Sequence, residues 1–260
     1  MLKRIKPDSP ITGRGRLHLP DPATQGPYRP FTTDPGWSEA WWWLSIPVLF
    51  AIWLVLTWRI APTWYSKWVI PEGYGILEFF QFIILLVALA IALRLLFKPF
   101  VRKRPFVFAV SIFAVLGCIY TAGEEMSWGQ HLFHWNTPEY WAMVNRQQET
   151  NLHNAYPAFE RWPRTMVELG AVIGGILVPI AAAFFPRMRS NRLSLFLPAA
   201  ALLPIAVIAI GFALEDVLNQ KRFIQQLVHR PSEAVELYLY YFIFAYLLIF
   251  TRRITELETQ

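Results

Sequence analysis

The polar residues best suited to chemistry are concentrated in a stretch that directly follows an apolar run. From residue 123 the chain reads Gly-Glu-Glu-Met-Ser-Trp-Gly-Gln-His-Leu-Phe-His-Trp. If this stretch is helical, four of its side chains share an arc of about 80° on one face. These four residues are Glu124, Ser127, His131 and His134. A carboxylate, a hydroxyl and two imidazoles on one face could carry acid–base chemistry or bind a metal ion.

Glu124 and Glu125 form the first candidate for acid–base chemistry. Two adjacent carboxylates in a partly desolvated environment repel each other, and this repulsion raises the pKa of at least one of them. A glutamate that keeps its proton near neutral pH suits general acid–base catalysis. We therefore predict that one acts as general acid or base while the other tunes it. The alternative is that both cap or solvate the end of a helix.

A second polar run follows at residues 145–154 and contains Glu149 and His153 four positions apart. On a helix such a pair shares one face, so we predict that Glu149 orients His153 as a second base or ligand. The alternative is an ordinary solvated helix at the membrane surface. Uncharged polar residues of the two runs are predicted to hold polar groups of a substrate, namely Ser127, Gln130, Asn151 and Asn154.

Two further kinds of site residue are predicted. Glu215 and Asp216 end the fifth apolar run and are expected to join the substrate-binding layer. His131 and His134 are three positions apart and could share a divalent metal such as zinc. The further ligands would be His153 and either Glu124 or Glu149. However, the HExxH motif is absent, and no GxSxG turn presents a serine nucleophile.

The composition indicates that membrane helices position these residues. Hydrophobic residues make up 55% of the 260 residues and charged residues only 16%, against about 25% charged in a typical soluble domain. Six apolar segments approach the length that crosses a bilayer as a helix. Their expected limits are 41–58, 76–97, 106–122, 166–185, 193–214 and 234–250. We therefore predict an all-α polytopic bundle, with its fifth helix kinked at Pro198 and Pro204.

The distribution of charge predicts the orientation. With both termini placed inside, the inner segments hold 16 of the 24 Lys and Arg residues, as the positive-inside rule requires. The net charge of +6 then serves orientation, and we expect membrane lipids as partners and no nucleic acid. The acidic candidates fall on the outer side. We expect three regions, in which a basic tail (1–38) and a short tail (252–260) flank a membrane domain (39–251) with an outer amphipathic segment (123–164).

The two polar runs resemble a signature found in bacterial multi-span membrane proteins, of the form E-E-x-S-W-G-Q followed by E-T-N-x-H-N. The resemblance covers about 35 residues and carries no activity with it. The Glu124–Glu125 pair is also similar to that of CAAX-type intramembrane proteases. In those proteases an arginine follows the pair, and this chain has Gly129 in its place.

Taken together, these features predict a multi-pass protein of the bacterial inner membrane with a polar site at its periplasmic face. The expected activity is hydrolysis or group transfer on a lipid, a lipid-linked or a lipidated substrate. The alternative is a non-enzymatic subunit of a larger membrane complex, with a membrane-protein partner, or a small transporter. Acids near one face favour the enzyme, since a transporter is expected to place them near the bilayer midplane.

Overall fold

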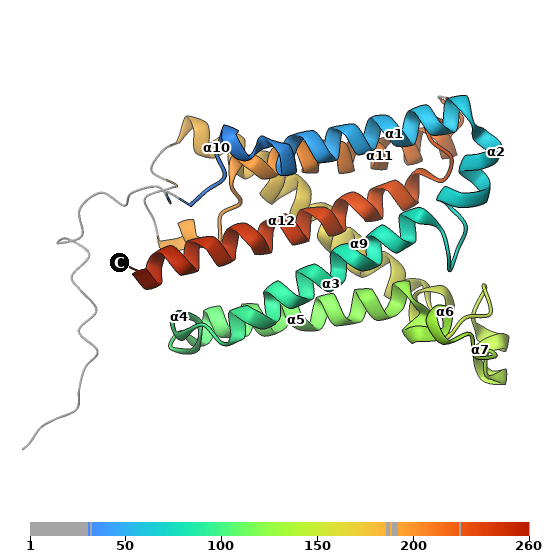
Figure 1. Ribbon diagram of the computed structural model, residues 1–260, viewed down its shortest axis with the longest axis horizontal. Helices are drawn as coiled ribbons and strands as arrows, with labels where there is room; N and C mark the ends of the chain where they lie inside the picture. Colours follow the sequence, from blue (N-terminus) through green and yellow to red (C-terminus); the bar gives the residue numbers. More distant parts are fainter. Residues whose placement is uncertain (1–30, 32, 186–187, 189–191, 224, 260) are drawn as a thin grey trace, which may run out of the picture.

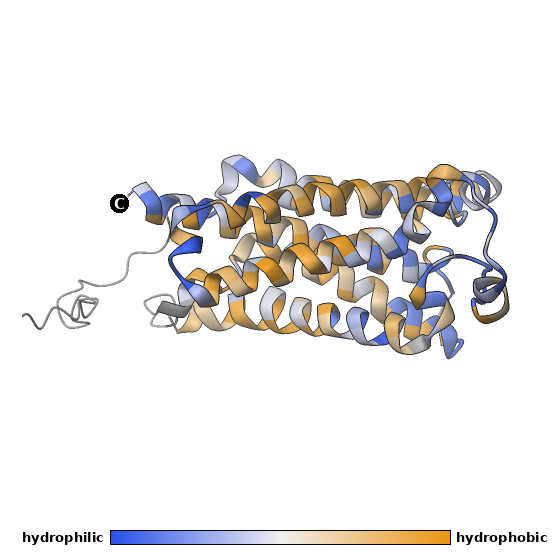
Figure 2. Cartoon of the chain, turned by 90° about the horizontal axis from the view of Figure 1, so that it is seen from below, coloured by the Kyte–Doolittle hydropathy of each residue, from blue (hydrophilic) through white to orange (hydrophobic). Residues whose placement is uncertain are grey.

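The regular elements of this chain are helices. The computed structural model describes residues 31, 33–185, 188, 192–223 and 225–259, and this part of the chain contains no strand. Six of its helices are long and apolar enough to cross a membrane, which confirms the predicted all-α polytopic bundle. They are Trp41–Ile60, Ile76–Leu96, Pro105–Glu125, Arg161–Phe184, Ala200–Gln220 and Pro231–Thr259. Figure 2 shows hydrophobic residues along these helices and hydrophilic residues at their ends.

The longest helix, α12 (Pro231–Thr259), runs through the middle of the bundle (Figure 1). On one side it packs against α11 (Leu203–Gln220), which lies beside α1 (Ile46–Ile60). On its other side it packs against α3 (Ile76–Leu96), which in turn contacts α5 (Pro105–Glu125). The fourth span consists of α9 (Pro157–Gly170), a π-helical turn (Ala171–Leu177) and α10 (Val178–Phe184). The short helices are α2 (Pro62–Trp64), α4 (Pro99–Arg102), α6 (Gln130–Phe133), α7 (Glu139–Val144) and α8 (Leu152–Ala155).

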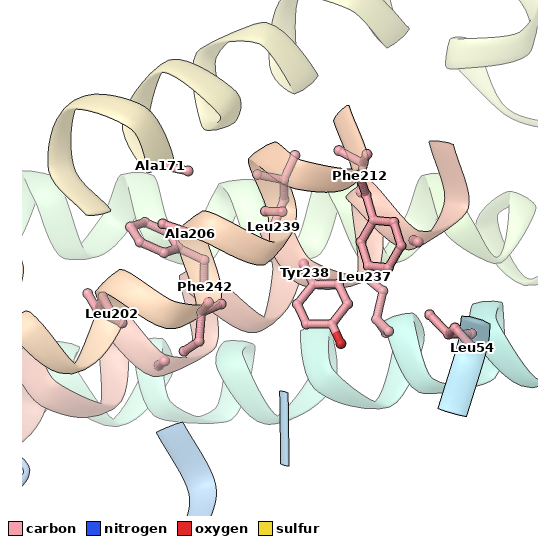
Figure 3. Close-up of a cluster of buried hydrophobic side chains, with 14 of the residues drawn as sticks. Leu54, Ala171, Leu202, Ala206, Phe212, Leu237, Tyr238, Leu239 and Phe242 are labelled. Atoms are coloured by element: carbon pink, nitrogen blue, oxygen red, sulfur yellow. The ribbon is translucent and has the colours of Figure 1, made fainter. Parts of the chain in front are cut away.

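Small residues allow the fourth and fifth spans to approach α12 closely. Ala171 and Ala206 are fully buried beside the ring of Phe242 in the cluster drawn in Figure 3. A Cβ atom built on Gly175 would lie 2.5 Å from the Cβ of Ala206 and 2.7 Å from a ring carbon of Phe242. Because lipid tails are as apolar as leucine, such close van der Waals contact is what holds membrane helices together.

The fifth span begins later than predicted and the predicted kink is wrong. Helix α11 starts at Leu203, so Pro198 precedes the helix and Pro204 lies in its first turn. Proline is well tolerated there, because the first N–H groups of a helix have no partner inside it. The span therefore continues to Gln220, beyond the expected end at residue 214.

The two ends of the described chain meet at one end of the bundle. The predicted tail 1–38 lies mostly outside the described residues, but Asp34 forms a two-point ion pair with Arg253 of α12 at 2.6 and 2.7 Å. Thr33 donates a hydrogen bond from its hydroxyl to Glu256 at 2.8 Å. Residues 252–259, which were expected to form a tail, continue α12. An even number of spans brings both ends to the same side of a membrane.

Candidate functional site

The predicted single polar helix face at residues 124–134 does not form. Helix α5 ends at Glu125, and after Met126 the backbone becomes left-handed, with φ of 46° at Ser127 and 54° at Trp128. Gly129, with φ of 101°, continues this reversal before α6 begins. The chain therefore turns back on itself, and His134, which is exposed, no longer shares a face with Glu124.

Glu124 is buried and its carboxylate is surrounded by donors. The indole N–H of Trp128 donates to Oε1 at 2.6 Å. The backbone N–H groups of Leu152 and His153 donate to Oε2 at 2.7 and 2.8 Å. The Nδ1 atom of His153 lies 3.2 Å from the same oxygen. Glu124 thus fixes the start of α8 to the end of α5, and we define the segment between α5 and α9 (residues 126–156) as the connecting lobe.

Glu149 is surrounded in the same way inside the connecting lobe. Ser127 donates from its hydroxyl to Oε2 at 2.9 Å, and Asn151 donates from its amide at 2.7 Å. His131 places Nε2 3.3 Å from the other carboxylate oxygen and 3.0 Å from the hydroxyl of Ser127. Burial would raise the pKa of Glu149, but the hydrogen bonds from His131 and Ser127 outweigh it and hold that pKa below its ordinary value.

The predicted pairing of Glu149 with His153 is wrong, because the two residues are not on one helix. Asn151 accepts a hydrogen bond from the backbone N–H of Asn154 and so acts as the N-cap of α8. Glu149 lies before this cap. His153 pairs with Glu124 instead, and Glu149 pairs with His131.

Other predicted substrate-binding residues form hydrogen bonds within the connecting lobe. Gln130 accepts a hydrogen bond from the backbone N–H of Thr150 at 2.8 Å, and the same oxygen lies 3.0 Å from the Thr150 hydroxyl. The Thr150 hydroxyl also donates to the carbonyl of Ser127 at 2.7 Å. The amide of Asn151 donates to the hydroxyl of Ser127 at 3.0 Å. The two polar runs are thus partners in a single hydrogen-bonded network.

A cavity of about 390 Å³ lies under the connecting lobe, between it and helices α3, α5, α9 and α12. Seven of the twelve predicted site residues line it: Glu124, Glu125, His131, Glu149, Asn151, His153 and Asn154. Its remaining acidic walls are Glu72, Glu78, Glu233 and Glu236. Apolar side chains complete its lining from α9 and α12, namely Phe159, Pro163, Val167, Leu239 and Ile243.

Within this cavity Glu125 differs from the acids that pair with arginine. Its carboxylate accepts a hydrogen bond of 2.6 Å from the hydroxyl of Tyr240 on α12. The acids Glu233 and Glu236 instead lie 3.1 Å from Arg230 and 3.4 Å from Arg164, respectively. No ion pair of Glu125 is found among the described residues. Glu78 also forms no ion pair among the described residues, and accepts the backbone N–H of Gly73 instead. Glu125 is therefore one of two cavity acids that are not paired with a cation, and the one that is held by a tyrosine hydroxyl.

Tyr240, Arg164 and Arg230 were not predicted as site residues. Tyr240 follows Glu233 by seven positions and Glu236 by four, which places all three on one face of α12. That spacing, inside an apolar run, was the signal that could have identified it. The two arginines carry no comparable signal, because Arg164 lies within α9 and Arg230 directly precedes α12, and isolated basic residues are common beside membrane spans.

The remaining predictions fall outside the cavity. Glu215 accepts hydrogen bonds from the backbone N–H groups of Leu227 and Val228, at 2.7 and 3.1 Å, and so secures the loop after α11. Asp216 lies 3.9 Å from Arg164. Gln130 and His134 line a smaller hollow on the connecting lobe. The described residues contain no group of three or more His, Cys, Asp or Glu that could hold a metal ion, and the ring of His131 is already engaged by Ser127 and Glu149. The predicted zinc site therefore does not fit this arrangement.

Comparison of the chain with protein-family models, curated proteins and solved structures finds no match.

Proposed function

We propose that this multi-pass membrane protein is an enzyme that hydrolyses, or transfers a group from, a lipid, lipid-linked or lipidated substrate bound in the cavity. The observation that carries the proposal is the pair formed by Glu125 and Tyr240, 2.6 Å apart, in a cavity that is both acidic and apolar. Small-molecule sites commonly combine an apolar lining with a few convergent polar groups.

The two kinds of lining suit a molecule with a polar head and an apolar tail. The carboxylates and arginines gather where α3, α5 and α12 meet the connecting lobe. The apolar part of the lining comes from α9 and from the stretch of α12 that leads toward the middle of the membrane, including Leu239 and Ile243. A substrate could therefore keep its head among the acids and its chain among the apolar residues.

We infer that such a molecule enters from the side, between α5 and α9. At this level the hydroxyl of Tyr120 donates to the carbonyl of Phe159 at 3.3 Å, so this contact would have to open. Tyr120 and Phe159 both line the cavity. Entry between the helices would spare an acyl chain from passing through water.

In the proposed reaction Glu125 is the general acid or base. As a base it accepts a proton from the attacking water or alcohol, and it returns that proton to the leaving group. The hydroxyl of Tyr240 holds the carboxylate in place. Arg164 and Arg230 line the same cavity and would stabilise negative charge that develops on a carbonyl or phosphoryl oxygen. Glu124 and Glu149, whose carboxylates already accept several hydrogen bonds within the protein, position the connecting lobe over the reacting groups.

The proposed location is the bacterial inner membrane, with the cavity on the periplasmic side. This orientation rests on the excess of Lys and Arg in the segments at the opposite end of the bundle. It would give the enzyme access to the outer leaflet and to substrates exported across the membrane.

The test compares the membrane lipids and lipidated proteins of cells that produce the wild type, Glu125→Gln or no protein, by mass spectrometry. Glu139→Gln is the matched control, because Glu139 is an exposed acid of α7 that does not line the cavity. We expect a product that accumulates with the wild type and the control. With equal amounts of protein in the membrane, Glu125→Gln should form it roughly 100-fold more slowly or worse. Equal product from Glu125→Gln, or no product from the wild type, would contradict the proposal.

A second candidate function follows from the excess of acids over arginines in the cavity lining. Such a cavity would attract cations, so a small cation transporter is the alternative. Wild-type proteoliposomes that dissipate a sodium or proton gradient, in a manner abolished by Glu125→Gln, would favour it. A lipid product formed without any gradient would favour the enzyme.

A further inference from the structure

The connecting lobe is polar inside. Among its most deeply buried side chains are Ser127, Asn151 and Asn145, which are 0%, 1% and 4% exposed. The amide of Asn145 donates to the side-chain and backbone oxygens of Asn151, at 2.7 and 3.0 Å. Its own oxygen accepts from the backbone N–H groups of Gln147 and Glu149, at 2.9 and 3.2 Å. The polar groups of the lobe are therefore satisfied by each other.

The surface of the connecting lobe is unusually apolar. Phe133 is 75% exposed, Met143 is 73% exposed and Leu132 is 52% exposed. The rings of Phe133 and Trp135 stack on each other, with centroids 6.1 Å apart. In a domain surrounded by water, large apolar side chains are buried and contiguous apolar patches on the surface are small. The connecting lobe instead exposes these large apolar side chains beside exposed polar ones, such as Glu139 and Gln148.

A buried polar network beneath a surface of exposed apolar and polar side chains suits the boundary between lipid and water. Outside water, each unpaired polar group costs several kcal/mol, so polar groups must pair internally while apolar groups face outward. Helices α6 and α7 lie at the end of α5, on the side of the bundle away from α1 (Figure 1). The exposed Tyr140 of α7 links this surface to α9, because its hydroxyl lies 2.6 Å from that of Tyr156, whose ring contacts the exposed Phe159.

We propose that the connecting lobe lies in the interfacial layer of the bilayer, with Leu132, Phe133 and Met143 inserted between lipid molecules. The occupant of this surface is thus the membrane that the six helices already cross, rather than a second protein. Continuity with the lipid-facing surface supports this choice. So do the exposed Trp135 and Tyr140, because amphipathic rings favour the level of the headgroups.

The experiment places a polarity-sensitive fluorophore at single cysteines in the full chain. Cys118 is the one cysteine of the sequence and is buried in α5, so Cys118→Ala provides the background. Phe133→Cys and Met143→Cys report on the apolar surface, and either suffices if the other fails to fold. Phe113→Cys, on the exposed face of α5, marks the lipid. Lys221→Cys, exposed in the turn after α11, is the polar control.

The labelled proteins are reconstituted into phosphatidylethanolamine–phosphatidylglycerol vesicles and quenched from either phase. We expect spin-labelled lipids to quench positions 133 and 143 at least twofold more than position 221, with little quenching by aqueous iodide. Iodide quenching equal to that of position 221 would overturn the proposal, since the surface would then face water. Protection from both quenchers would also overturn it, because a protein partner or a second copy would then cover the surface.

Discussion

Glu124 and His153 are 29 positions apart, and the Glu124 carboxylate accepts the backbone N–H of His153 at 2.8 Å. The same oxygen lies 3.2 Å from Nδ1 of the His153 ring. A buried carboxylate at the end of a membrane helix thus holds both the backbone and the side chain of a distant turn. This contact fixes the position of the connecting lobe above the cavity.

The first prediction concerns this attachment. Glu124→Ala leaves the N–H groups of Trp128, Leu152 and His153 without their acceptor. Each buried donor left unpaired costs roughly 1–3 kcal/mol, so the lobe should open locally while the helices remain intact. Hydrogen exchange followed by mass spectrometry should show faster exchange over residues 145–156. Glu139→Ala, which removes an exposed acid, should leave that exchange unchanged. Equal exchange in the two variants would show that Glu124 does not hold the lobe.

The second prediction is a dependence of lobe stability on pH through Glu149. Its pKa in the folded protein lies below the ordinary value of 4.5, so the ionised form stabilises the fold. That stabilisation is complete above the unfolded pKa and is lost as the pH falls through the folded pKa. At pH 7 the wild type should therefore resist proteolysis of the lobe better than Glu149→Gln. The difference should shrink below about pH 4.5. A difference that persisted undiminished at lower pH would contradict this role.

The third prediction uses two neighbouring arginines of α12 as a matched pair. Arg253 is 4% exposed and binds Asp34 as well as the carbonyl oxygens of Ser194 and Leu195. Arg253→Met should lower the free energy of unfolding by about 3 kcal/mol. This is the lower end of the range for a broken buried ion pair, because Asp34 is partly exposed. Arg252→Met breaks the more exposed pair with Glu39 and should cost at most about 1 kcal/mol. Unfolding in mild detergent measures both, and equal losses would contradict the distinction.

The fourth prediction tests the close contact between the fourth span and α12. Gly175→Ala places a methyl group against Ala206 and Phe242, so it should destabilise the bundle by about 1–3 kcal/mol. Gly117→Ala is the control, because nothing lies within 4 Å of the position its Cβ would take. It should leave the unfolding temperature equal or raise it slightly. A Gly175→Ala protein as stable as the control would show that the helices can separate without cost.

The six spans were predictable because hydropathy reports directly on the lipid that surrounds them. The arrangement of the site residues was harder to predict. Periodicity assumes that a helix continues, and the left-handed residues Ser127 and Trp128 end that continuity after Glu125. The same assumption paired Glu149 with His153, although Asn151 begins a new helix between them. Spacing on one helix could have revealed Tyr240, whereas the meeting of Glu124 with His153 depends on a chain reversal that short-range patterns do not encode.

The length of α12 links the two faces of the membrane. Its 29 residues span roughly 43 Å at 1.5 Å per residue, more than the ~30 Å hydrocarbon core. One end carries Glu233 and Glu236 in the cavity wall, and the other is clamped by Asp34 through Arg253. Because one continuous helix joins the Asp34–Arg253 ion pair to the cavity wall, breaking that pair would remove a contact that fixes the position of α12 on the opposite side of the membrane.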